Sequence, residues 1–106
     1  MLSKLDGIKK RYIELTAEIA SNEVIADQSK WQKLVKERSA LEPIAELYDK
    51  YLKCAKDFEE CKTILSGEHD EELAALAKEE FDELKTKFET LLEELKIALL
   101  PKDPKD

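Results

Sequence analysis

The sequence predicts an all-α fold built from three long amphipathic helices. Apolar residues recur every three or four positions along nearly the whole chain, a spacing that gives a helix one apolar face. The 106 residues include only two glycines and three prolines, too few for the many tight turns of a β-sandwich or barrel. A chain of this length suits one domain with a modest hydrophobic core.

The first predicted helix covers residues 2–20. Its apolar stripe is formed by residues three or four apart, namely Leu2, Leu5, Ile8, Tyr12, Leu15 and Ile19. The polar turn formers of residues 21–29 interrupt this pattern and predict a loop. Within that loop, Val24 and Ile25 are expected to tuck against the helices.

The second predicted helix begins near Asp27 or Ser29, where Ser29 and Gln32 fit a capping box. Its seam has coiled-coil spacing and consists of Leu34, Leu41, Tyr48 and Ala55 with Ile44, Tyr51, Phe58 and Leu65. An interior proline costs a helix about 3 kcal/mol, yet the seam passes Pro43 in register. We therefore predict one kinked helix rather than two, ended by Gly67 in a left-handed conformation.

The third predicted helix begins near Asp70, where Glu71 and Glu72 complement the helix dipole. A second seven-residue seam follows, made of Ala74, Ala77, Phe81, Leu84, Phe88, Leu91, Leu95 and Ala98. The helix is expected to end before Pro101, because the residue before a proline avoids helical geometry.

Short connections make consecutive helices antiparallel. The second and third helices should thus form a helical hairpin, with the first helix packed on its base. The first helix is about 28 Å long and the second about 55 Å, so the first reaches only the part from Trp31 to Tyr48. We expect the far half, residues 51–65 and 73–84, to be more mobile and to be the favoured partner site.

Charge and cysteine usage narrow the classes of protein. The net charge of −7 argues against a large basic surface for nucleic acid. The sequence has no membrane-spanning apolar run and no secretion signal, which predicts a cytoplasmic protein. Cys54 and Cys61 would lie about 10 Å apart along one helix, too far for a disulfide, so free thiols are expected.

The sequence predicts no catalytic, cofactor or metal site. Neighbouring carboxylates on a helix point in different directions, and the chain lacks a glycine-rich phosphate loop. His69 is the only histidine and lies in a predicted turn. Cys54 and Cys61 alone are too few to hold zinc.

Five residues are candidate partner contacts. Lys9, Lys10 and Arg11 form the densest basic run, which suits either a phosphate contact or a solvated helix face. Tyr48 and Tyr51 lie on the seam, where aromatic side chains usually form the core. Their hydroxyl groups nevertheless need a partner or water.

Four stretches together resemble the N-terminal helical domain of bacterial-type peptide chain release factor 1, a family of class I translation release factors. They are LSKLDGIKKRYIEL, IADQSKWQKLVKERSALEPIAELY, EFDELKTKFETLLEELKIALL and LLPKDPKD. The last is the most specific, because LLPKDP marks the exit from this domain in the family. The helical seams alone would suit any bundle.

The resemblance implies a role in translation termination. Members of the family read the stop codons UAA and UAG on the ribosome and promote peptidyl-tRNA hydrolysis, using a Pro-x-Thr-type motif and a Gly-Gly-Gln motif whose glutamine is methylated. Neither motif occurs here, so no catalytic residue carries over. The resemblance further implies that residues 1–100 are a non-catalytic domain of a longer factor and that residues 101–106 lead to its missing domains.

The implied partners are the ribosome, through protein and ribosomal RNA near the stalk base of the large subunit, and the remaining domains of the same factor. No membrane, cofactor or small-molecule substrate is expected. Two alternatives stay open at this point. One is an unrelated coiled-coil scaffold or adaptor, and the other is an independent enzyme, for which the sequence offers no cofactor motif and no nucleophile–base pair.

Overall fold

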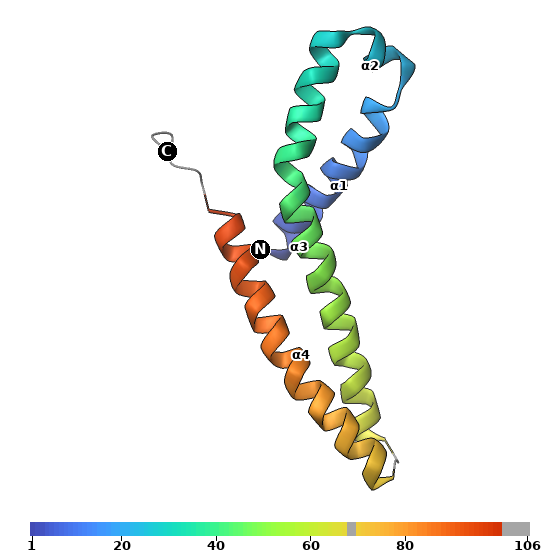
Figure 1. The fold of residues 1–106 in the computed structure, drawn as a ribbon, viewed down its shortest axis with the longest axis vertical. Coiled ribbons are helices and arrows are strands. Elements are labelled where there is room, and N and C mark those ends of the chain that lie inside the picture. Colours follow the sequence, from blue (N-terminus) through green and yellow to red (C-terminus); the bar gives the residue numbers. More distant parts are fainter. Residues whose placement is uncertain (68–69, 101–106) are drawn as a thin grey trace. The chain divides into compact units, whose positions relative to one another are not determined.

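A computed structural model describes residues 1–67 and 70–100 of the chain, and within these ranges it contains helices and no strand. The all-α prediction is therefore confirmed (Figure 1). The helices in chain order are α1 (Leu2–Ile19), α2 (Asn22–Ala26), α3 (Gln28–Ser66) and α4 (Glu71–Ala98). His69 and the tail 101–106 lie outside the described residues, so the predictions for them stay untested.

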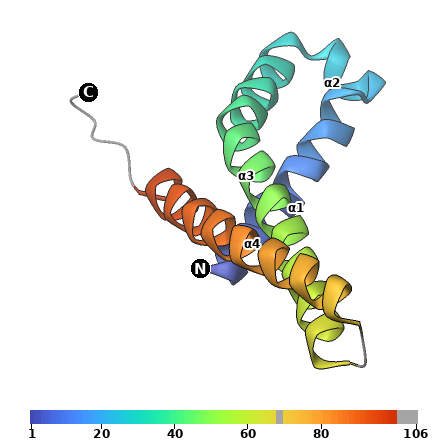
Figure 2. The same cartoon turned by 60° about the horizontal axis from the view of Figure 1, so that its bottom comes forward.

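The chain divides into two compact units, Met1–Tyr48 and Asp49–Asp106. The first unit contains α1, α2 and the N-terminal part of α3. The second contains the C-terminal part of α3 and α4, which turns back along it (Figures 1 and 2). The boundary falls where the first helix was expected to stop covering the second.

The connection from α1 to α3 differs from the predicted loop, because it contains the short helix α2. The hydroxyl of Ser21 accepts a hydrogen bond from the Val24 amide at 3.2 Å and caps this turn. Val24 is buried as expected, whereas Ile25 is 53 % exposed. One helical turn points adjacent side chains in different directions, so only one of the two can face inward.

The helix α3 is continuous through Pro43, which confirms one helix rather than two, while the kink expected at Pro43 stays a prediction. Its N-terminus is capped by Asp27, whose carboxylate accepts from the Lys30 amide at 3.2 Å. The proposed Ser29 capping box is therefore wrong, because the helix already includes Ser29. Gly67 follows the helix, but no described residue has a positive φ, so the expected left-handed ending is also wrong.

The helix α4 follows its prediction closely. The Asp70 carboxylate accepts a hydrogen bond from the Leu73 amide at 2.7 Å, and Glu71 and Glu72 occupy the first turn. Side chains of the predicted seam supply its buried positions, namely Ala77, Leu84, Leu91 and Leu95.

The two units have different cores. In the first unit the buried apolar side chains are Leu5, Leu15, Val24, Ala45 and Tyr48. In the second unit the two cysteines of α3 are buried together with Ala77, Leu84, Leu91 and Leu95 of the α4 seam. No helix in the described ranges is long and apolar enough to cross a membrane.

Candidate functional site

One residue of the basic run on α1, Arg11, forms an ion pair within the first unit. Arg11 donates two hydrogen bonds to the Glu37 carboxylate of α3, from Nε at 3.0 Å and from Nη2 at 2.8 Å. The Arg11 hydrogen bond lowers the pKa of Glu37, and the same bond raises the pKa of Arg11. Two parallel hydrogen bonds of this kind hold the Arg11 guanidinium on the Glu37 carboxylate. The other two residues of the basic run differ in exposure, since Lys9 is half-buried and Lys10 is exposed.

Arg38 links the same two helices, although sequence reasoning did not single it out. Its Nε donates to the Thr16 hydroxyl at 2.9 Å, and its Nη2 donates to the Tyr12 hydroxyl at 2.9 Å. The guanidinium carbon lies 4.6 Å from the centre of the Tyr12 ring. The sequence did contain one indication of this contact. Tyr12 lies on the apolar stripe of the first helix, and the hydroxyl of a tyrosine in such a position needs a polar partner.

The two candidate tyrosines take part in packing and lie in different units. Tyr48 is only 3 % exposed, and its hydroxyl donates a hydrogen bond to the Asp6 carboxylate of α1. Tyr51 is half-buried, with its ring centre 4.9 Å from that of Phe88 on α4. The five candidates are therefore distributed over two units, with Lys9, Lys10, Arg11 and Tyr48 in the first and Tyr51 in the second.

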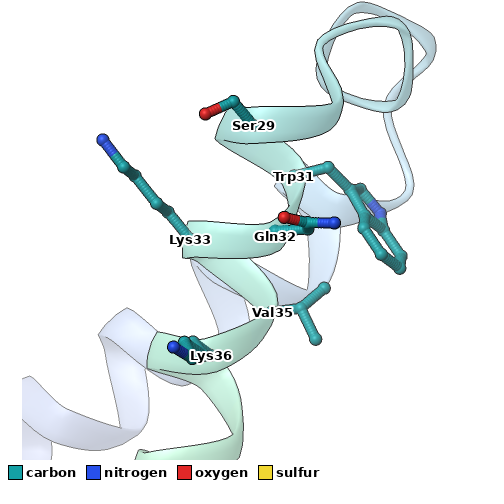
Figure 3. A pocket seen from close by; sticks show the side chains of 6 residues that line it. All are labelled: Ser29, Trp31, Gln32, Lys33, Val35 and Lys36. Carbon is teal, nitrogen blue, oxygen red and sulfur yellow. The ribbon is translucent and has the colours of Figure 1, made fainter.

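A surface hollow of about 390 Å³ lies at the start of α3. Trp31 and Val35 point to one side of this helix, whereas Ser29 and Lys33 point to another (Figure 3). The indole of Trp31 donates to the Ile19 carbonyl at 3.1 Å and so ties α3 to the end of α1, while the side chain stays 37 % exposed. All six lining residues come from one short stretch of helix, which makes this a surface feature rather than an enclosed cleft.

The second unit contains a more apolar groove, which sequence reasoning missed. Its volume is about 400 Å³, and it is lined by Ala55, Phe58 and Glu59 of α3 and by Lys85, Phe88, Glu89 and Leu92 of α4. We call these seven residues the α3–α4 groove. The Phe58 ring centre lies 4.4 Å from that of Phe81 and 6.2 Å from that of Phe88. These aromatic contacts between α3 and α4 shape the groove.

The two cysteines of α3 are buried free thiols. Burial raises the pKa values of Cys54 and Cys61, which keeps both as thiols rather than nucleophilic thiolates. The Cys54 thiol donates a weak hydrogen bond to the Leu84 carbonyl at 3.5 Å. Across residues 1–67 and 70–100, no cluster of three or more metal-ligating side chains occurs.

Comparison with known proteins adds the identity of the family. The model of the PCRF domain matches residues 8–106. The chain is 46 % identical over all 106 residues to peptide chain release factor 1 of Clostridium botulinum and of Clostridioides difficile. It is 42 % identical over the same length to peptide chain release factor 1 of Caldicellulosiruptor saccharolyticus. In each case the chain spans 30 % of the relative's length, and no solved structure matches it.

Proposed function

Because the chain belongs to the PCRF domain family, we propose that it serves translation termination as the helical, non-catalytic part of a peptide chain release factor 1. One observation supports this proposal most strongly. The alignment with proteins of that name covers the full length of the chain, at 46 % identity. A role at the stop codons UAA and UAG follows from the resemblance of the four quoted stretches to this family.

The proposed task of these helices is to dock the factor on the ribosome near the stalk base of the large subunit. Three features support a docking role. The described residues contain no cluster of side chains that could hold a metal ion, and the two cysteine thiols are buried. Apolar side chains are exposed on the helix surfaces, with Leu76 61 % exposed. Contiguous exposed apolar side chains mark partner-binding surfaces, and Leu73 and Leu76 lie about one turn apart on α4 at 46 % and 61 % exposed.

A chimeric factor tests the termination role. The segment of the Clostridioides difficile factor that aligns with this chain would be replaced by residues 1–106. We expect the chimera to retain stop-codon-dependent peptide release from ribosomes programmed with UAA or UAG. A matched control chimera would carry an unrelated helical hairpin of equal length, for which release should fall. If both chimeras behave alike, the chain contributes nothing specific to termination.

The 106-residue chain alone tests the non-catalytic part of the proposal. Added to ribosomes that hold peptidyl-tRNA over a stop codon, it should bind without releasing peptide, since it contains no Gly-Gly pair. Stop-codon-dependent release by this chain alone would contradict the assignment.

A further inference from the structure

The net charge of the chain belongs entirely to one unit. The first unit, Met1–Tyr48, contains eight basic and eight acidic side chains, whereas the second, Asp49–Asp106, contains ten basic and seventeen acidic ones. The whole net charge of −7 is thus carried by the unit that contains the α3–α4 groove. A negative surface attracts basic partners and repels the phosphates of nucleic acid.

The α3–α4 groove lies in this negatively charged unit and has an apolar floor. Ala55 and Phe58 of α3 and Phe88 and Leu92 of α4 form its apolar lining, and the Phe58 and Phe88 ring centres lie 6.2 Å apart. Aromatic side chains in a groove supply large contact area, and they dominate the energy of many protein interfaces. Because the Phe58 ring is also packed on Phe81 at 4.4 Å, the floor is held in place before any partner arrives.

The walls of the groove place a carboxylate on each side. Glu59 stands on α3 and Glu89 on α4, with Lys85 as the one basic residue of the lining. The Glu59 carboxylate lies 3.6 Å from the Lys62 ammonium, which itself lies 5.3 Å from the Phe58 ring centre. The Lys62 ammonium is thus within reach of both this carboxylate and this ring. Because the Lys62–Glu59 pair is exposed to solvent and therefore weak, an arginine or lysine of a partner can replace Lys62 at this combination of carboxylate and aromatic face.

We propose that the α3–α4 groove binds an amphipathic helix of a ribosomal partner protein, with apolar side chains on the Phe58–Phe88 floor and Arg or Lys side chains against Glu59 and Glu89. A groove between two helices with an apolar floor is the usual acceptor of such a helix. The charge of the walls selects a basic helix and disfavours RNA. The inference rests on the proposed function only in assigning the partner to the ribosome.

The test uses two charge-reversal variants of the 106-residue chain. Glu59→Lys/Glu89→Lys changes one wall residue on each helix. The matched control, Glu60→Lys/Glu83→Lys, makes the same change in charge on the same two helices at exposed positions outside the groove. A third variant, Ala55→Arg, fills the groove with a long side chain. Far-UV circular dichroism and urea unfolding would establish that each variant is folded.

The first probe is a synthetic 18-residue peptide with leucine at helical spacing on one face and arginine on the flanks. Its affinity would be measured by fluorescence anisotropy at about 0.15 M salt, where exposed charges more than about 8 Å apart are largely screened. We expect Glu59→Lys/Glu89→Lys and Ala55→Arg to weaken binding at least about tenfold, a change of about 1.4 kcal/mol. The control variant should stay within about threefold of the original chain. Equal weakening by both charge variants, or greater weakening by the control, would overturn the groove assignment.

The second probe is the ribosome itself, in co-sedimentation with salt-washed 70S particles. Loss of ribosome binding in the two groove variants and its retention in the control support the inference. Unchanged binding of the groove variants would overturn it while leaving the proposed function intact. Peptide binding through the groove without any ribosome binding would instead contradict the proposed function. Preferential binding of a free ribosomal RNA fragment by the groove would replace the protein partner with RNA and overturn the proposal.

Discussion

The two units of the chain are stabilised in different ways. The first unit has equal numbers of acidic and basic side chains, and the guanidinium groups of Arg11 and Arg38 and the indole N–H of Trp31 join its helices by hydrogen bonds. The second unit carries the net charge, and aromatic rings and buried thiols occupy the space between its helices. The units therefore differ in net charge and in the kind of contact that joins their helices, polar hydrogen bonds in the first and aromatic packing in the second.

The largest effect is expected from removing an aromatic ring of the second unit. Phe58→Ala deletes the contacts of this ring with Phe81 and Phe88 and should lower the free energy of unfolding by about 3 kcal/mol. Urea unfolding followed by circular dichroism would measure it. Leu76→Ala, at a side chain that is 61 % exposed in the same unit, should cost under about 0.5 kcal/mol. Similar costs for both substitutions would mean that the rings do not hold the second unit together.

The buried thiols should show the next largest effect. Burial of Cys54 and Cys61 and their raised pKa values should slow alkylation by iodoacetamide at pH 8 at least about 100-fold relative to the urea-unfolded chain. The rate also tests the predicted mobility of this half of the chain, because local opening would allow alkylation faster than global unfolding. Equal rates in the native and unfolded chain would contradict the buried placement of both thiols.

A smaller effect is expected from the tyrosine of the first unit. Tyr48→Phe keeps the buried ring but removes the hydrogen bond to Asp6, which should cost about 1 kcal/mol of unfolding free energy. The same substitution in a chain that already carries Asp6→Ala should cost clearly less, since the acceptor is gone. Identical costs in both backgrounds would show that the hydroxyl gains nothing from Asp6, and a double-mutant cycle in urea measures the difference.

The smallest effect should come from the Arg11–Glu37 pair, which is exposed to solvent. Arg11 lowers the pKa of Glu37 in the folded chain. The folded state therefore binds this proton less readily than the unfolded state, and the pair stabilises the fold above the unfolded pKa of Glu37. This contribution disappears as the pH falls through the lowered pKa.

Unfolding curves of the original chain, Arg11→Ala, Glu37→Ala and the double variant would measure the coupling. We expect a favourable coupling at pH 7 that is reduced by 1 M salt and absent at the acid end of the range in which the chain still folds. Coupling that is unchanged by acid and by salt would show that the pair is not electrostatic in origin.

The long helices were predictable because their apolar spacing is regular over many turns. The α4 seam was predicted in this way. The start of α4 near Asp70 was expected from the acidic residues that complement the helix dipole. The register of the α3 seam across Pro43 predicted a continuous helix. The proline is exposed, so water can solvate the Ser39 carbonyl that lacks its usual amide partner. Cys54 and Cys61 are free thiols, as expected from their spacing along one helix.

The exact helix ends were harder to predict, because several neighbouring residues could each cap a helix. Ser21, Asp27 and Ser29 are all good cap residues, and the sequence alone does not show that Ser21 caps α2 while Asp27 caps α3. The α3–α4 groove was missed for another reason. Phe58 and Phe88 were assigned to a seam, and a seam pattern does not reveal that the contact between two helices leaves Ala55 and Leu92 partly uncovered beside the rings.

Side-chain footprinting of the chain on 70S ribosomes tests the central claim most directly. Hydroxyl-radical oxidation would be quantified by mass spectrometry in the free and the ribosome-bound chain. We expect protection of Phe58, Phe88 and Leu92 in the second unit, while oxidation of the exposed Trp31 in the first unit stays unchanged. Protection of Trp31 with unchanged oxidation of Phe58 and Phe88 would contradict docking through the acidic second unit.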